Sequence, residues 1–212
     1  MEMTSRNGAR IEVADGVLLD GRLALFHQKQ RWLALADLHF GFELSQRAAG
    51  NLFPLWGMQT IQTRVQELVS DYEPTNLILV GDLIHDRTAA EAFSAWVNEL
   101  SALTSVVLIS GNHDRHLSKW ANVRSSWRVD GFVFHHGHCE MDPGTDLQVI
   151  GHHHPAQVMR DGAGLRLKLP AFVQQDRCWI MPAFSPWAAG TIWPADDQTK
   201  VWVCSPNRVL EL

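Results

Sequence analysis

Five short polar clusters in this sequence combine histidine, aspartate and asparagine at spacings that suit metal binding. Any one alone has a simpler explanation, since Gly-Asp is common in turns and Asp-x-His places two side chains on one side of a strand. Together they would be costly to desolvate at one sheet edge unless a cation neutralised them. Carboxylate, amide and imidazole ligands without thiolates suit borderline divalent ions. The clusters are Asp37-x-His39, Gly81-Asp82, Gly111-Asn112-His113-Asp114, His136-Gly137-His138 and Gly151-His152-His153-His154.

The first three clusters each follow a short apolar run that predicts a buried strand, and helical spacing of apolar residues predicts a helix between successive strands. Strands alternating with helices form right-handed crossovers in a largely parallel sheet. Ligands of such sheets gather at the carboxyl ends of the strands, where these clusters stand. The predicted strands are 31–36, 77–80 and 106–109, and the predicted helices are 55–69 and 89–103.

The second half of the chain predicts strands without long helices between them, which indicates a second sheet that is mixed or antiparallel. No linker, low-complexity run or long repeat divides the sequence, so we expect one α/β domain over residues 1–212. The strands predicted in this half are 132–135, 147–150, 165–169, 178–181 and 201–204.

Composition narrows the classes of protein that fit. The net charge of −5 argues against a surface coated in positive charge for gripping nucleic acid, although it allows a local basic strip. No apolar run is long enough to span a membrane, and residues 1–8 lack the apolar core of a secretion signal. Three cysteines without a C-x-x-C pair suit a reducing compartment. We therefore expect a cytoplasmic protein with no membrane partner.

The order D-x-H, G-D, G-N-H-D, H-G-H, G-H-x-H resembles that of the calcineurin-like metallophosphoesterases, over roughly residues 33–155. The resemblance implies a two-sheet β-sandwich flanked by helices, with two divalent metal ions above the strand ends. It implies that hydroxide activated by the two metals attacks phosphorus and that a histidine protonates the leaving group. The implied ligands are Asp37, His39 and His154 for one metal, Asn112, His136 and His152 for the other, and Asp82 between them, with His113 beside the metals.

Some assignments within this pattern stay open. His135 or His138 is an alternative to His136, and His153 occupies the variable position of G-H-x-H. Asp114 either orients His113 or caps the following turn. Where many relatives carry aspartate three residues after the bridging Asp82, this chain has His85, a departure expected to affect hydrogen bonding around the ligands more than metal binding itself.

A narrower resemblance concerns the substrate. The motifs at residues 37–43, 81–85, 169–172 and 181–186 are similar to those of the bacterial ligase-associated DNA damage response endonucleases. That resemblance implies phosphodiester hydrolysis in DNA repair, on single-stranded or damaged DNA, by an enzyme that accompanies an ATP-dependent DNA ligase and a helicase. The expected metal is Mn²⁺, with Fe²⁺, Zn²⁺ and Ni²⁺ as alternatives.

A basic strip follows His113 and supports a DNA substrate independently. Residues 115–129 contain no acidic residue, and two tryptophans are interleaved with their cations. The cations are suited to holding phosphates and an indole to stacking on an unpaired base; the alternative is a solvated helix face with its tryptophans in the core. The predicted contacts are Arg115, Lys119, Trp120 and Arg124.

Two other functions fit the same motifs. A phosphatase or cyclic-nucleotide phosphodiesterase would need a closed pocket sized for one nucleotide, which sequence does not reveal. A non-catalytic scaffold is expected to lose metal ligands or the histidine at position 113, and this chain keeps all of them. The sequence therefore favours an enzyme.

Overall fold

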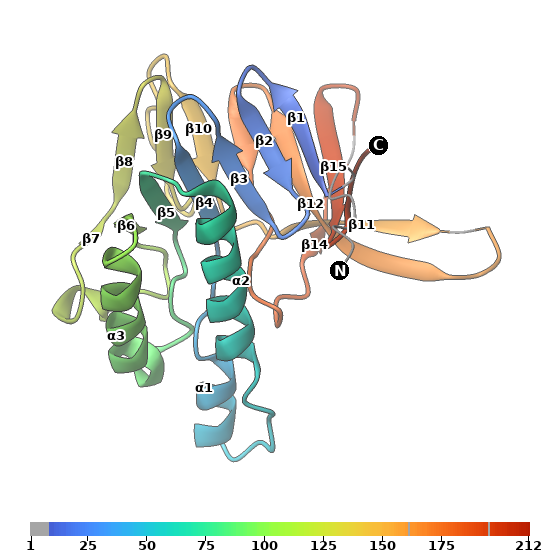
Figure 1. Cartoon of the computed structure of the whole chain (residues 1–212). Coiled ribbons are helices and arrows are strands. Elements are labelled where there is room, and N and C mark those ends of the chain that lie inside the picture. The colour runs from blue at the N-terminus through green and yellow to red at the C-terminus, as the bar shows by residue number, and fades with distance from the viewer. Residues whose placement is uncertain (1–8, 161, 195) are drawn as a thin grey trace, which may run out of the picture.

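Two mixed β-sheets pack against each other in the computed structural model, which describes residues 9–160, 162–194 and 196–212 (Figure 1). Within these residues the first sheet has seven strands in the order β1 to β7, and the second has nine. The first sheet contains β1 Arg10–Ala14, β2 Val17–Asp20, β3 Ala24–His27, β4 Trp32–Ala36, β5 Asn76–Val80, β6 Ser105–Ile109 and β7 Val123–Arg124. The second contains β8 Ser126–Val129, β9 Phe132–His135, β10 Leu147–Ile150, β11 Pro155–Arg160, β12 Arg166–Gln175, β13 Cys178–Ile180, β14 Thr191–Ile192, β15 Thr199–Ser205 and β16 Arg208–Glu211.

The centre of the first sheet is parallel, as predicted, from β4 through β7. The last residues of β4, β5 and β6 lie side by side in register: Ala36 pairs with Val80, and Val80 with Ile109. This alignment brings the polar clusters that follow the three strands to one edge. The prediction of a largely parallel sheet was wrong for β1 to β4, which pair antiparallel, because sequence analysis did not recognise the short strands before residue 31.

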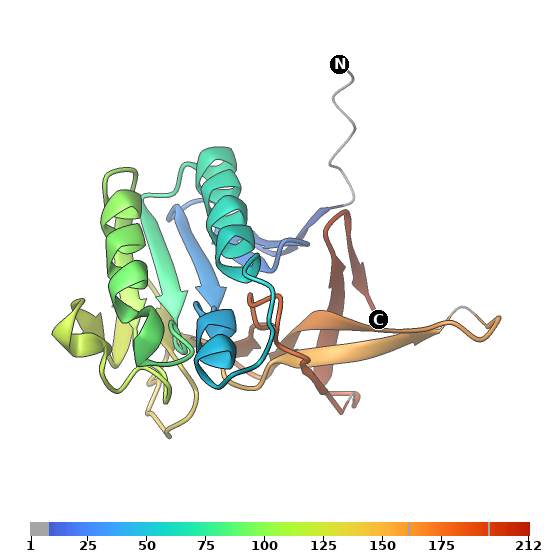
Figure 2. The ribbon, with the colours of Figure 1, turned by 90° about the horizontal axis from the view of Figure 1, so that it is seen from below.

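Helices cover one face of this sheet, and Figure 2 shows α2 and α3 lying along its parallel strands, with α3 on the β6 side. Both predicted long helices are confirmed, and each buries an apolar stripe at helical spacing, led by Ile61 and Val65 in one and by Phe93 and Trp96 in the other. The short α1 was not predicted. The helices are α1 Phe42–Ala48, α2 Gly57–Tyr72 and α3 Ala90–Ser101, with 3₁₀ turns η2 Arg87–Ala89 and η3 Leu117–Lys119.

Aromatic side chains fill the space between the two sheets. The fully buried ring of Trp32 lies edge-on to Phe132 and Phe134, with ring centroids 5.0 Å apart in both pairs. Edge-to-face pairs of this kind are favoured by the ring quadrupole and add to the burial of large apolar areas. The seam between β4 and β9 is thereby fixed, which places the residues after β9 close to those after β4.

The second sheet carries a long hairpin, formed by β11 and β12, that projects from the body of the protein (Figures 1 and 2). The strand β12 changes partners along its length: residues 166–170 pair with β11, and residues 171–175 pair with β15. The predicted mixed or antiparallel second sheet is confirmed, with parallel pairs only at β9–β10, β10–β13 and β11–β14.

Residues 1–8, on which the expectation of no secretion signal rests, lie outside the described residues. None of the helices in the described part of the chain has the length and apolar character needed to cross a membrane. The cytoplasmic location stays a prediction.

Candidate metal centre and active site

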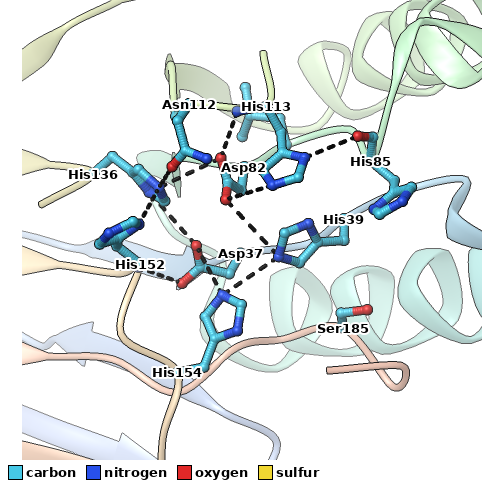
Figure 3. Close-up of polar contacts among 12 residues, drawn as sticks. Asp37, His39, Asp82, His85, Asn112, His113, His136, His152, His154 and Ser185 are labelled. Carbon is cyan, nitrogen blue, oxygen red and sulfur yellow. Dashed lines mark hydrogen bonds and ion pairs between the residues drawn. The ribbon is translucent and has the colours of Figure 1, made fainter. Parts of the chain in front are cut away.

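The ligands predicted from sequence converge at the carboxyl ends of β4, β5 and β6, although they come from five separate segments (Figure 3). Three groups of potential ligand atoms form there among the described residues, and two of them consist of predicted ligands; in each group the atoms lie within 4.8 Å of one another. The first group is Asp37, His39 and His154, and the second is Asp82, His136 and His152.

The first group joins the end of β4 to the loop before β11. The Nε2 atoms of His39 and His154 lie 3.4 Å apart, and Asp37 Oδ1 lies 3.5 Å from the Nε2 atom of His154. Two imidazole nitrogens and a carboxylate oxygen that converge in this way match a cation site. These are the three residues that the sequence assigns to one metal.

The second group gathers around His136, whose Nε2 atom lies 3.2 Å from His152 Nδ1 and 3.4 Å from Asp82 Oδ1. Asn112 joins it, with its Oδ1 atom 3.1 Å from the same nitrogen. An amide oxygen, a carboxylate and two imidazoles are the donor set predicted for the other metal.

Asp82 lies between the two groups. Its Oδ1 atom faces His136, while its Oδ2 atom lies 4.0 Å from the Nε2 atom of His39. Burial by itself would raise the pKa of Asp82, but hydrogen bonding to His136 and to the His113 backbone N–H lowers it overall. The carboxylate is therefore charged at neutral pH and presents one oxygen to each group, as a bridging ligand would.

The backbone at this edge adopts conformations that are unusual for residues other than glycine. Five predicted ligands have positive φ angles, between 41° and 69°, a region that costs energy and persists at functional sites where the surroundings enforce it. Left-handed turns after β4, rather than alternation along a strand, therefore bring the first Asp-x-His pair together. The five are Asp37, His39, Asp82, His152 and His154.

Two glycines allow the loops to approach this closely. A Cβ atom at Gly81 would lie 1.9 Å from His136 Nδ1, and Gly81 itself has a φ of +69°. A Cβ atom at Gly151 would lie 2.4 Å from Asp37 Oδ2. Any larger residue at either position would displace a predicted ligand.

The donor set fits a pair of divalent metal ions. Among the described residues, Asp37 Oδ1 and His136 Nδ1 are buried without a hydrogen-bond partner, and an unpaired buried carboxylate oxygen is costly. The two atoms lie 3.5 Å apart. The second oxygen of Asp37 accepts a 2.8 Å hydrogen bond from the His152 backbone N–H, so only one oxygen is left facing the cluster. A bound cation would balance the charge of this unpaired Oδ1 atom of Asp37.

The electrostatics of the two groups differ. Burial lowers the pKa of His39 to about 3, so this ring is neutral at pH 7 with a lone pair available for a metal. Burial alone would also lower the pKa of His136, but hydrogen bonding to Asp82 and the charge of Asp37 raise it above its ordinary value of 6.5. A metal ion bound here therefore competes with a proton for His136.

His113 lies beside the ligands and remains 40% exposed. Its Nδ1 atom is 3.1 Å from the backbone carbonyl of His85, and since a carbonyl only accepts, the Nδ1 proton points there. The Nε2 atom lies 4.0 Å from Asp82 Oδ2, on the side of the metal ligands. This placement suits a proton donor to a substrate held between the two groups.

His85, which sequence analysis treated as a departure from the family pattern, also lies at the centre. It forms a third group with His39 and His113 whose ligand atoms lie within 4.8 Å of each other, and its ring stacks on His113 at 5.6 Å. Burial and the nearby His113 lower the pKa of His85. Its motif position was visible in the sequence, but its contact with His113 was not.

Asp114 does not contact the ring of His113. Its Oδ2 atom accepts hydrogen bonds from the backbone N–H groups of Gly111 and Leu83, at 2.7 and 3.1 Å, and its Oδ1 atom accepts one from Ile84 at 3.1 Å. The alternative in which Asp114 orients His113 is therefore wrong in this structure. The buried carboxylate instead ties the loop after β6 to the loop after β5.

The structure also distinguishes His136 from the neighbouring histidines that the sequence left as alternatives. The Nε2 atom of His135 points to Gln148 Oε1 at 2.9 Å, because His135 is the last residue of β9 and faces away from the ligands. His138 lies near the rings of His136 and His152 without joining either ligand group. His153 packs against Trp193.

The basic strip after His113 is not a helix; it forms η3, β7 and β8. Trp127 packs against the core near Phe134, at 5.8 Å, and Arg128 is held by Asp146 and loop carbonyls. Trp120 is 51% exposed. The predicted contacts Arg115, Lys119 and Arg124 are exposed as well, so their role in DNA binding stays a prediction.

An open groove of about 580 Å³ runs beside His113. His85, Asn112 and His113 line it, and so do the charged residues Asp86, Arg87 and Arg115. Among the predicted DNA contacts, Arg115 is the one that reaches this groove.

Two packed sheets, with two groups of metal ligands at the ends of parallel strands, are the arrangement expected of a metal-dependent phosphoesterase. Comparison with known proteins supports the same class of enzyme. Residues 31–156 match the profile of the calcineurin-like phosphoesterases, so the chain belongs to that family. Members of this family use two metal ions, which confirms the predicted class of enzyme and cofactor and leaves the identity of the metal as a prediction.

Two solved structures are similar to this chain. The crystal structure of nuclease MPE from Pseudomonas putida is similar with a TM-score of 0.77 and 27% identity, over 97% of this chain and 100% of that chain. This similarity fits the predicted subgroup. Yfce, a phosphoesterase from E. coli, gives a TM-score of 0.48 and 16% identity over 85% of this chain and 97% of that chain. None of the curated proteins compared with this chain matches it.

Proposed function

We propose that this protein is a phosphodiesterase that cleaves single-stranded or damaged DNA in repair, with two divalent metal ions, Mn²⁺ first among them. The observation that carries the proposal is the pair of ligand groups on either side of Asp82, with His113 next to both. The similarity to a nuclease over nearly the whole chain supports a polynucleotide substrate. An ATP-dependent DNA ligase and a helicase remain the proposed partners.

The proposed roles follow from the contacts. Asp37, His39 and His154 would hold one ion, Asn112, His136 and His152 the other, and Asp82 both. Two ions bound there would acidify water and neutralise charge on the phosphoryl oxygens. As water adds to phosphorus and loses a proton, the bond from phosphorus to the leaving oxygen breaks. His113, which must enter this step doubly protonated, donates the proton on Nε2 to that oxygen and is left neutral, with its Nδ1 N–H still on the His85 carbonyl.

The open groove beside His113 favours a polymer over a small nucleotide. A phosphatase or cyclic-nucleotide phosphodiesterase is expected to enclose its substrate in a pocket, whereas this groove is open, with Arg87 and Arg115 in its lining beside Asp86. A chain of phosphates has room to continue along it.

The experiment that tests the proposal is cleavage of circular single-stranded DNA by Mn²⁺-loaded protein, with Asp82→Asn as the inactive control. A circle has no ends, so cutting by the wild type alone is the expected result and would establish an endonuclease. Hydrolysis of a simple phosphodiester without cutting of circular, linear or damaged DNA would refute DNA as the substrate and keep the metal chemistry.

A further inference from the structure

A cavity of about 290 Å³ adjoins the candidate metal centre at His154. Figure 3 places His154 and His113 at opposite ends of the ligand cluster, so this cavity and the groove beside His113 flank the centre on two sides. Arg22, Arg64 and Lys168 line the cavity together with Ser185. Its described lining includes no acidic residue, although the protein has a net charge of −5.

Arg64 forms no ion pair with a carboxylate among the described residues, although the charge of Glu67, one turn further along α2, acts on it. It projects from α2, its guanidinium lies 4.9 Å from the ring centroid of Phe184, and one of its N–H groups donates a 3.2 Å hydrogen bond to the Phe184 carbonyl. Arg22 differs, because Asp20 and Asp71 both pair with it. A half-buried guanidinium with unused donors, in a cavity free of carboxylates, suits an anionic ligand.

Phe184 fixes Arg64 relative to the metal ligands. Its backbone N–H donates a 2.8 Å hydrogen bond to the carbonyl of Ala36, the last residue of β4, and the next residue, Ser185, donates to the carbonyl of Asp37 at 3.2 Å. The cation is therefore held on the same backbone segment that supports the first ligand group.

Lys168 extends the positive charge onto the β11–β12 hairpin. Its Nζ atom donates a 2.7 Å hydrogen bond to the Gly190 carbonyl at the cavity wall. Side chains alternate along a strand, so Arg166 lies on the same face as Lys168, about 6.6 Å further out. Arg160 pairs directly with Arg166 across the hairpin and shares that face.

The two arginines face each other at exposed positions, and no acidic partner for either lies in the described part of the chain. Like charges directly opposite on paired strands are unfavourable. An anion that lies across both would remove the repulsion. The hairpin projects into solvent (Figure 2), which leaves this face open to a ligand as long as a nucleic-acid strand.

We propose that the cavity beside His154 and the basic face of the hairpin bind the phosphodiester backbone of single-stranded DNA on one side of the bond that is cut. This inference rests on the proposed function and extends it. The cavity, at about 290 Å³, is at the small end of ligand pockets, and we place one phosphate of the strand in it, against Arg64 and Lys168. Arg160 and Arg166 then hold the phosphates further out.

The test compares two triple variants that lose the same charge. Arg160→Gln, Arg166→Gln and Lys168→Gln remove the proposed contacts, while Lys29→Gln, Lys200→Gln and Arg208→Gln remove three exposed cations that line none of these surfaces. Binding of a labelled phosphorothioate single strand, which keeps the charge of DNA and resists cleavage, is followed by fluorescence anisotropy on Mn²⁺-loaded protein across a salt series. Circular dichroism checks that both variants fold.

The hairpin variant is expected to bind at least ~10-fold more weakly than wild type, and the slope of log affinity against log salt should fall by about 2, since each single-strand phosphate contact contributes about 0.7. Its loss of cleavage on the single strand should exceed its loss on bis-p-nitrophenyl phosphate. The control variant should keep most of the slope. Arg64→Gln, a separate variant that leaves the hairpin unchanged, should also weaken binding of the strand.

Two results would overturn the proposal and are distinguishable. If wild type binds and cuts the single strand but the hairpin variant and Arg64→Gln match the control variant, the hairpin and cavity are not the binding surface and the proposed function stands. If wild type hydrolyses the small diester but neither binds nor cuts the strand, both the inference and the proposed DNA substrate are wrong.

Discussion

The Nε2 atoms of His39 and His154 lie 3.4 Å apart although 115 positions separate the residues in the sequence. Burial lowers the pKa of His39 to about 3, so its ring is neutral and can offer a lone pair to a cation that the His154 nitrogen also faces. Asp37 Oδ1, 3.5 Å from the same nitrogen of His154, adds the negative charge such a site needs. The pair therefore marks the first metal position more directly than either residue does alone.

Asp82→Asn should weaken metal binding at both positions, because Asp82 presents one oxygen to each ligand group. We expect affinity to fall by more than ~10-fold, the lower end of losses seen when even outer-shell partners of a metal are removed. Metal content after dialysis, measured by atomic emission, checks this, with the exposed Asp130→Asn as control. Retention of two ions by Asp82→Asn would contradict the bridging role.

His113→Ala should keep both metal ions and lose turnover, because His113 lies beside the ligand groups without joining the two assigned to metals. General acid catalysis contributes about 10²–10⁴-fold, so we expect that loss for DNA and a smaller one for a p-nitrophenyl ester, whose leaving group needs no proton. Steady-state kinetics on both substrates give the comparison. An equal loss on the two would argue against a proton donor.

Metal affinity should rise with pH through the range in which His136 titrates. Burial alone would lower the pKa of His136, yet Asp82 and Asp37 raise it above 6.5 in the metal-free protein, so metal and proton compete for its Nε2 atom. The pKa of His39, about 3, lies below this range and adds no competition. Calorimetry at pH 6 and pH 8.5, in buffers of different ionisation enthalpy, should detect more proton release at pH 6. Equal release would contradict the assignment.

Asp114→Ala should destabilise the fold rather than act on chemistry alone. It removes three hydrogen bonds from a buried carboxylate to the backbone N–H groups of Gly111, Leu83 and Ile84. Each such bond to a charged group is worth about 1.5–3 kcal/mol and the three are coupled, so we expect a loss of ~3 kcal/mol or more. Urea unfolding measures it. Full stability with lost activity would restore a direct catalytic role for Asp114.

Arg115→Ala, Lys119→Ala and Arg124→Ala together should weaken DNA binding and flatten its dependence on salt. These three cations are exposed, and Arg115 lies in the groove beside His113. The effect on DNA should exceed the effect on a small chromogenic diester. Trp120→Ala should reduce affinity for single strands further through lost stacking. Equal losses on both substrates would show that the strip acts on the metal centre and not on DNA.

Much of the parallel half of the fold was predictable because its signals are local. The apolar runs that end at Ala36, Val80 and Ile109 predict three strands, and the residues that follow each run predict the sheet edge where the ligands gather. The helices between them follow from periodicity. The short strands β1 to β3 and the helix α1 were missed because each is too short to show a clear hydrophobic period. The strands are defined by the hydrogen bonds to their neighbours, which the sequence does not show.

The sequence by itself determined the types and order of the metal ligands, because those residues belong to contiguous motifs at strand ends. The tertiary structure decided how they meet. Left-handed turns at Asp37 and His154, and not strand alternation, aim the first group, and the exit of the chain from β9 selects His136 over His135. It also placed Arg64 beside Lys168, from a helix and a hairpin far apart in sequence. Motifs report local chemistry, whereas the distance between two segments depends on how both sheets pack.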